Sequence, residues 1–211
     1  MSEPAELYDA ILKGNAKKAE EVTKAALASG LDPNELVHKY MIPAMDEVGK
    51  RFECNDYFVP ELLIAARAMK TSLALITPHL VRTGAQPAGR VVIGTVQGDL
   101  HDIGKNLVAS MLEGGGFQVV DLGVDVPPQK FVDAAKEKAG TIVAVSALLT
   151  TTMTMMKTVI DALGKAGIRA TTRVMIGGAP ITQQYANEIG ADGYADNASS
   201  AVGLARQLVK A

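Results

Sequence analysis

Residues 91–106 read VVIGTVQGDLHDIGKN, and this stretch decides the fold. Residues 91–96 form an apolar run of β-type residues, which predicts a buried strand, and a helical pattern begins at Lys105. The polar turn between them holds Asp99, His101 and Gly104. A strand that leads through a short turn into a helix is typical of a βαβ unit, which builds parallel sheets.

The same strand–helix alternation continues to the end of the chain. Further strands are expected at 118–122, 141–146, 174–176 and 193–195, the last of them weak. Helices are expected at 105–113, 129–138, 153–165, 182–188 and 199–209. Continuous apolar strands between helices predict a parallel sheet covered on both faces. Residues 90–211 are therefore expected to form an α/β domain with a flavodoxin-like, doubly wound, five-stranded parallel sheet.

The residues before this domain have a helical pattern. One apolar stripe, at steps of three or four, predicts a long helix and consists of Phe58, Leu62, Ala66, Met69, Leu73, Ile76 and Leu80. Shorter helices precede it, with breaks expected near Gly14, at 30–33 and at 54–57. We expect a four-helix bundle over residues 1–84, followed by a linker at 85–89 that is rich in small residues and includes Pro87.

Composition excludes several classes of protein. Of the 211 residues, 48% are hydrophobic, and the formal net charge is −2. Neither half of the chain has a basic excess, so no nucleic-acid partner is expected. No apolar run approaches the length of a membrane span or resembles a secretion signal. Cys54 is the lone cysteine, which fits a reducing compartment, and we expect a soluble cytoplasmic protein without a membrane partner.

The turn after the first strand has the residue types of a metal site. It contains neither a GxGxxG nor a GxxxxGK[ST] phosphate-binding pattern. Asp99 stands two residues before His101, so its carboxylate can hold one ring nitrogen while the other faces a metal. One imidazole is a poor site for a free ion but suffices for a metal already held in a macrocycle. The alternatives at this point are that His101 only caps the following helix or that it is a satisfied histidine of the turn.

Three motifs resemble the cobalamin-binding signature. Asp99-x-His101-x-x-Gly104 is followed by Ser146-Ala147-Leu148 after 41 intervening residues (105–145), and Gly177-Gly178 follows after 28 more (149–176). In the helical half, Val48-Gly49-x-x-Phe52 and the segment 58–62, FVPEL, resemble the cap that precedes the cobalamin domain. The chain thus resembles corrinoid methyl-carrier proteins and the cap and cobalamin domains of cobalamin-dependent methionine synthase over nearly its whole length.

This resemblance implies a role for each matched residue. His101 replaces the cofactor's own lower base on cobalt, Asp99 holds His101, and Thr152 is the third member of the network. Methionine synthase has Ser at the position of Thr152 and Pro at that of Thr151. The implied cofactor-binding residues are Gly98, Asp99, His101, Asp102, Ile103, Gly104, Ser146, Leu148, Thr150, Gly177, Gly178, Ala198, Phe52, Val59 and Leu62. Away from this resemblance, Phe52, Val59 and Leu62 read as bundle core, Gly177-Gly178 as a tight turn, and Ser146 with 150–152 as helix caps.

The function implied is that of a methyl carrier. Cobalamin or a related corrinoid takes a methyl group from a substrate-specific methyltransferase and passes it to a second methyltransferase that uses tetrahydrofolate or a thiol. A reductive activator is a further implied partner. The methyl donor, the final acceptor, the lower base and the oligomeric state stay open, and so does classification as an enzyme. Alternatives are a cobalamin-dependent sensor without its own DNA-binding domain, the cobalamin part of a mutase, or a module for another nucleotide.

Overall fold

The computed structural model describes residues 4–83 and 86–210 and divides into two compact units. The first contains the residues up to Pro87 together with Glu113–Gly116, and the second contains Ala88–Leu112 and the residues from Phe117 onward. The division after Pro87 falls inside the linker predicted at 85–89, of which Ala85 lies outside the described residues. The predicted domain limits at residues 84 and 90 stay predictions.

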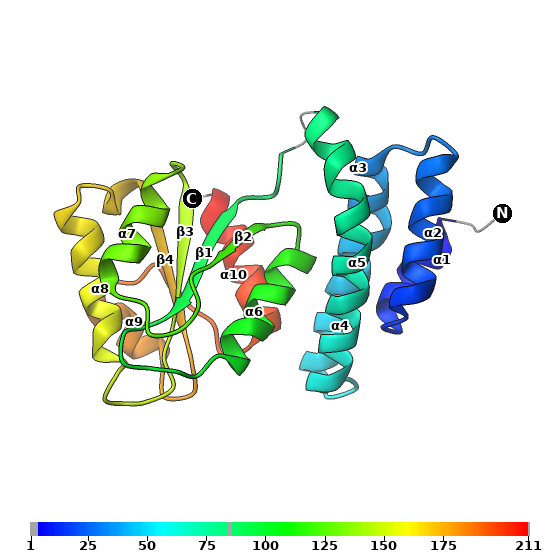
Figure 1. Cartoon of the computed structure of the whole chain (residues 1–211). Coiled ribbons are helices and arrows are strands. Elements are labelled where there is room, and N and C mark those ends of the chain that lie inside the picture. The colour runs from blue at the N-terminus through cyan, green and yellow to red at the C-terminus, as the bar shows by residue number, and fades with distance from the viewer. Residues whose placement is uncertain (1–3, 84–85, 211) are drawn as a thin grey trace. The chain divides into compact units, whose positions relative to one another are not determined.

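The first unit is helical (Figure 1). Its elements are α1 (Ala5–Leu12), α2 (Ala16–Ala28), α3 (Pro33–Glu35), the π-helix η1 (Leu36–Met41), α4 (Ile42–Glu53) and α5 (Val59–Thr83). The predicted breaks lie where they were expected. Gly14 and Gly30 follow α1 and α2 with φ of 67° and 80°, a conformation that favours glycine. The Asp32 side chain caps α3 by accepting the Asn34 N–H at 2.9 Å.

Two features of this unit differ from the sequence prediction. The π-turn η1 joins α3 to α4, and Pro43 follows it without an amide hydrogen for the helical ladder. Phe58 is not part of the buried stripe, because it precedes α5 and its side chain is exposed. Its N–H instead donates to Glu61 Oε2 at 2.9 Å, which caps the first turn of α5. Leu62 and Met69 are buried as the stripe predicts.

The second unit contains a five-stranded parallel sheet. Its strands are β1 (Arg90–Thr95), β2 (Gln118–Asp121), β3 (Thr141–Ser146), β4 (Arg173–Gly177) and β5 (Gly193–Tyr194). The order β2-β1-β3-β4-β5, with every neighbouring pair parallel, confirms the flavodoxin-like prediction. β1 is buried along its whole length, whereas β2 is partly exposed because it lies at the edge of the sheet.

Helices cover both faces of this sheet. They are α6 (Ile103–Gly114), α7 (Pro128–Lys136), α8 (Thr154–Lys165), α9 (Gln183–Ile189) and α10 (Ala198–Lys210), and the 3₁₀ turn η2 (Arg169–Thr171) precedes β4. Figure 1 shows α7, α8 and α9 on one face and α6 and α10 on the other. The core beneath α7–α9 includes Phe131, Val143, Met156 and Val174. These helices begin and end within two residues of their predicted limits.

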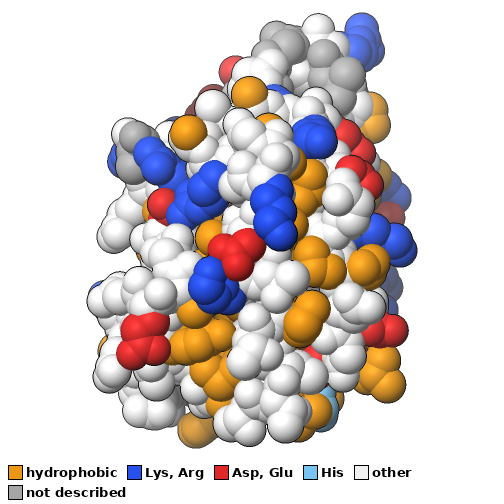
Figure 2. Space-filling view, turned by 90° about the vertical axis from the view of Figure 1, so that its left-hand side faces the viewer, with side chains coloured by type: hydrophobic (Ala, Val, Ile, Leu, Met, Phe, Trp, Pro, Cys, Tyr) orange, Lys and Arg blue, Asp and Glu red, His pale blue; other side chains and the backbone are white. Residues whose placement is uncertain are grey.

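This topology places the site. β1 and β3 are neighbours, and the chain leaves them toward opposite faces, so their carboxyl ends are the switch point where sheets of this kind bind ligands. Figure 2 views the molecule from the side of α7–α9: its Lys and Arg side chains lie in the upper and middle parts, and none is seen in the lowest part, toward the carboxyl ends of the strands.

Among the described residues, no helix combines the length and hydrophobicity that crossing a membrane requires.

Candidate functional site

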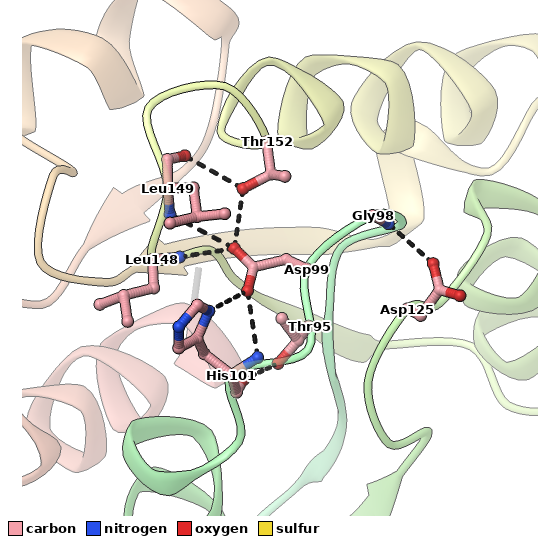
Figure 3. Close-up of polar contacts among 8 residues, drawn as sticks. All are labelled: Thr95, Gly98, Asp99, His101, Asp125, Leu148, Leu149 and Thr152. Atoms are coloured by element: carbon pink, nitrogen blue, oxygen red, sulfur yellow. Dashed lines mark hydrogen bonds and ion pairs between the residues drawn. The ribbon is translucent and has the colours of Figure 1, made fainter.

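Asp99 is the centre of the site, in the loop between β1 and α6. Its side chain is 0% exposed, and each carboxylate oxygen accepts several hydrogen bonds (Figure 3). Oδ2 accepts the backbone N–H of Leu148 at 2.8 Å, that of Leu149 at 3.3 Å and the Thr152 hydroxyl at 2.7 Å. Oδ1 accepts from His101. The loop after β3 thus holds the loop after β1 through one carboxylate.

These contacts decide the charge of Asp99. Burial by itself raises the pKa of a carboxyl group, because the charged form loses its solvation. Here the hydrogen bonds from the Leu148 N–H, the Thr152 hydroxyl and His101 outweigh burial and hold the pKa of Asp99 well below its usual range. Asp99 is therefore a fixed negative charge at the carboxyl end of β1.

His101 uses this charge to orient its ring. Its Nδ1 lies 2.7 Å from Asp99 Oδ1, and its backbone N–H donates to the same oxygen at 3.1 Å. The Thr95 hydroxyl donates to the His101 carbonyl oxygen at 2.8 Å. An ionised carboxylate can only accept, so Nδ1 carries a proton, and the neutral tautomer with this contact has its free lone pair on Nε2. The side chain is 50% exposed, which leaves Nε2 available to a metal.

Thr152 is the third member of this network, which we call the Asp99–His101–Thr152 network. Its hydroxyl lies 2.7 Å from Asp99 Oδ2 and 3.0 Å from the Leu149 carbonyl oxygen. A hydroxyl has one proton, so these two acceptors compete for it. Thr152 lies just before α8 and is buried. The hydroxyl thus contacts Asp99, and the role in cobalt binding that the resemblance implies for it stays a prediction.

The surface around His101 is apolar. Four hydrophobic side chains near it are exposed: Leu100 by 73%, Ile103 by 78%, Leu148 by 41% and Leu149 by 42%. In the described part of the chain, no three His, Cys, Asp or Glu side chains cluster as metal ligands. A lone imidazole on an apolar surface does not suit a free ion, but it fits a metal held in a flat organic ring that covers these side chains.

The glycines of the motifs differ in how much room a side chain would have. A Cβ on Gly178, which has φ of 133°, would lie 1.9 Å from the Ala147 carbonyl oxygen, and one on Gly177 would lie 3.0 Å from that of Ala195. The resemblance implies that this pair binds the cofactor, but close contact within the protein already requires glycine at position 178. Gly104 lies in the first turn of α6, and a Cβ there would meet nothing within 4 Å. Packing within the chain therefore does not require glycine at position 104.

The other predicted site residues are distributed over several elements of the two units. Ser146 ends β3, Thr150 is exposed in the following loop, and Ala198 is buried at the start of α10. Gly98 lies beside Thr152, and the exposed Asp102 accepts from Asn106 Nδ2 at 3.1 Å. In the helical unit, Leu62 is buried, Phe52 is partly buried and Val59 is exposed. Contact of these residues with a cofactor stays a prediction.

Sequence reasoning missed three contributors to the site. They are the Thr95 hydroxyl, the Leu149 N–H, and Asp125, whose Oδ1 accepts the Gly98 N–H at 2.7 Å. Thr95 ends β1 next to the motif, and its hydroxyl was the only sequence signal. Nothing in the pattern around Asp125 distinguishes it from an ordinary loop acid.

An imidazole held by a buried carboxylate, at the switch point of a doubly wound sheet, is an arrangement that suits the binding of a metal cofactor. Comparison with known proteins specifies the class. Residues 89–203 and residues 5–77 each match a family described as a B12 binding domain. The chain therefore belongs to the B12-binding corrinoid proteins, and its cofactor is cobalamin or a related corrinoid.

Two relatives that are named as corrinoid proteins match this chain over nearly the whole length of both sequences. Trimethylamine corrinoid protein 1 of Methanosarcina acetivorans is 45% identical over 97% of this chain and 96% of its own. The dimethylamine corrinoid protein of Methanosarcina barkeri is 44% identical over the same shares.

Solved structures agree. A cobalamin-binding protein of Desulfitobacterium hafniense superimposes with a TM-score of 0.80 at 32% identity, over 99% of both chains. The methanol:cobalamin methyltransferase complex of Methanosarcina barkeri contains a chain that superimposes with a TM-score of 0.84 at 31% identity, over 97% of this chain and 78% of that one. The chain is thus a corrinoid methyl carrier of the kind that serves methyltransferases.

Proposed function

We propose that this protein carries a methyl group on corrinoid cobalt from a methylamine-specific methyltransferase to a second methyltransferase, which uses tetrahydrofolate or a thiol as acceptor. The names of the two relatives, which refer to trimethylamine and dimethylamine, support the donor. The methyltransferase complex among the similar structures supports a partner enzyme that binds this carrier. A reductive activator belongs to the proposal as the partner that restores the reduced cobalt. A cytoplasmic location is also part of the proposal, and the free thiol of Cys54 is consistent with it.

One observation carries the proposed role of His101: the 2.7 Å contact between its Nδ1 and the buried Asp99. The bound cobalt supplies the chemistry, because it can accept a methyl group and give it up again. His101 Nε2 is proposed as its lower axial ligand, in place of the cofactor's own base. Asp99 Oδ1 accepts the hydrogen bond from Nδ1, and the Thr152 hydroxyl donates to the other oxygen of Asp99, which keeps the ring in the tautomer that can bind a metal.

The remaining predicted residues are proposed to enclose the cofactor. Gly98, Asp102, Ile103 and Gly104 lie beside His101 in the loop and first turn, where they can contact the corrin edge. Ser146, Leu148, Thr150, Gly177, Gly178 and Ala198 lie at the ends of β3 and β4 and the start of α10, where they can line the tail. Phe52, Val59 and Leu62 are proposed to act from the helical unit as the cap.

Spectroscopy of the loaded protein tests the axial ligand. The protein is reconstituted with hydroxocobalamin, freed of excess cofactor and reduced to cobalt(II). We expect electron paramagnetic resonance to show coupling to one imidazole nitrogen in the wild type and its loss in His101→Ala. The matched control is His79→Ala, which removes an exposed imidazole of α5. A wild-type protein that retains no cobalamin, or coupling that survives in His101→Ala, would contradict the assignment.

Methyl transfer tests the donor. The reduced, loaded protein is mixed with trimethylamine, dimethylamine or methanol, each with the methyltransferase specific for it. We expect the visible spectrum to report methylation of cobalt with one of the amines and not with methanol. Methylation with methanol alone would replace the amine in this proposal but leave the axial-ligand result unaffected.

A further inference from the structure

Asp125 connects the segment after β2 to the loop that carries His101. Its Oδ1 accepts the Gly98 N–H at 2.7 Å, and its own N–H donates to the Asp99 carbonyl oxygen at 3.0 Å. Figure 3 shows this contact on the side of the loop away from Thr152. Gly98 and Asp99, which precede His101 in the loop, are thus held from the β2 side. Asp99 is also held from the β3 side, by the hydrogen bonds that its Oδ2 accepts.

A second carboxylate acts at the other end of the same loop. The ammonium group of Lys105 lies 2.5 Å from Asp121 Oδ2 and 2.6 Å from Asn106 Oδ1. Asp121 ends β2, and its Oδ1 accepts the Gly123 N–H at 2.8 Å. The segment from Gly98 to Lys105, with His101 in the middle, is therefore fastened at both ends to residues 121–125.

Each of these two contacts, at Asp125 and at Lys105, has an energetic cost in its local structure. Asp125 has φ of 52°, a left-handed conformation that only glycine adopts freely. The Lys105 side chain is 2% exposed and lies in the first turn of α6, where the helix dipole disfavours a cation. A backbone strain and a buried cation at the two ends of one short loop indicate that the position of this loop matters.

We propose that Asp121 and Asp125 form a clamp that holds the His101 segment at both ends and thereby sets how strongly His101 binds cobalt. This inference rests on the proposed function, because it takes His101 as the axial ligand. Both acids are positioning residues: Asp125 acts through Gly98 and Asp99, and Asp121 acts through Lys105. A loop that is already in place lets the imidazole bind without a further loss of conformational entropy.

The consequence can be measured as a redox potential. An axial imidazole stabilises cobalt(II) over cobalt(I), so tighter binding of His101 lowers the midpoint potential of this couple. A hydrogen bond to a charged acceptor is worth roughly a 10-fold change in an equilibrium constant. Loss of the Asp125 contact should therefore weaken His101 binding by roughly 10-fold, which corresponds to a potential about 59 mV higher for one electron.

Three substitutions at Asp125 separate its contact from its strain. Asp125→Gly removes the acceptor and relieves the left-handed conformation, Asp125→Ala removes the acceptor and keeps the strain, and Asp125→Asn keeps an acceptor and tolerates this conformation. The potential should rise in Asp125→Gly and Asp125→Ala and stay near wild type in Asp125→Asn. The control is Asp133→Ala, which removes an exposed acid of α7 whose Oδ1 accepts a hydrogen bond from Gln129 Nε2 at 2.7 Å.

Lys105→Met tests the other end independently of whether the Asp125 variants fold. It replaces the buried cation by an apolar side chain, while Asp121, whose side chain is 41% exposed, keeps its solvation. The potential should again rise. All measurements use the full chain loaded with hydroxocobalamin, with the nitrogen coupling of the cobalt(II) wild type recorded first. Absent wild-type coupling contradicts the axial ligand itself, whereas present coupling with unchanged potentials in Asp125→Gly and Lys105→Met overturns the clamp alone.

Discussion

A carboxylate that is fully buried yet charged makes the site sensitive to acid. The pKa of Asp99 is lower in the folded protein than in the unfolded chain, so the unfolded chain takes up the proton first as the pH falls. The stability that charged Asp99 contributes is present above its ordinary pKa of about 4 and is lost as the pH falls below it. We expect the free energy of unfolding of the cofactor-free protein, measured with urea from pH 6 to pH 3, to decline less steeply in Asp99→Asn. Parallel curves for the two proteins would contradict this.

The Thr152 hydroxyl is the one side-chain donor to Asp99 from the β3 side in the described structure. Thr152→Val keeps the shape and removes the donor, so a buried charge loses a hydrogen bond. We expect a loss of about 1–3 kcal/mol in the free energy of unfolding. Thr152→Ser keeps the hydroxyl and is the matched control, which should lose no more than about 1 kcal/mol through its missing methyl group. Equal losses in the two variants would show that the methyl group, and not the hydroxyl, accounts for the stability.

At this scale the sequence revealed side chains but not backbone partners. Asp99 and His101 are two residues apart, so their contact follows from local geometry, and Thr152 followed from the resemblance alone. The amides of Leu148 and Leu149 lie about fifty positions away and meet Asp99 only because β1 and β3 are neighbours. Asp125 has a left-handed backbone and accepts the Gly98 N–H with its side chain, and its sequence neighbours predict neither feature.

At the scale of the elements, two glycines of the motifs should respond oppositely to alanine. Gly104→Ala places a methyl group in open space within helix α6, so the cofactor-free protein should gain about 0.5–1 kcal/mol in stability. If a corrinoid fills that space, the same methyl group weakens its binding. Urea unfolding and the amount of retained hydroxocobalamin measure the two effects. Unchanged retention would show that Gly104 does not adjoin the cofactor.

Gly178→Ala should lower the free energy of unfolding of the protein even without a cofactor. Its Cβ would lie 1.9 Å from the Ala147 carbonyl oxygen, and its φ of 133° is unsuited to a side chain. We expect a loss of about 3 kcal/mol or more in unfolding free energy, or no folded protein. Gly164→Ala in α8 is the control, because a Cβ there meets nothing within 4 Å. A stable, fully folded Gly178→Ala would mean that the loop after β3 moves aside easily.

The order of elements in the α/β unit was predictable because apolar strand segments alternate with helical patterns, and the limits of its strands and of α6–α10 lie within two residues of those predicted. The π-turn η1 was not, since a π-turn keeps nearly the same apolar spacing as an α-helix and only Pro43 hints at it. The exposure of β2 was not predictable either. Its apolar centre at 119–120 resembles that of an inner strand, and only the strand order places it at the edge.

At the scale of the whole molecule, the division into two compact units predicts that the α/β unit is independent. Every member of the Asp99–His101–Thr152 network, and every strand of the sheet, lies in this unit. Its core under α7–α9 is formed from its own residues. We therefore expect a fragment of residues 88–211 to unfold cooperatively by circular dichroism and, when loaded with hydroxocobalamin, to show the same imidazole coupling as the full chain. The fragment with His101→Ala is its control. A fragment that shows no cooperative transition would mean that the helical unit supplies part of the folding energy of the sheet domain. A folded fragment without coupling would mean that the helical unit is needed to bring the cofactor to His101.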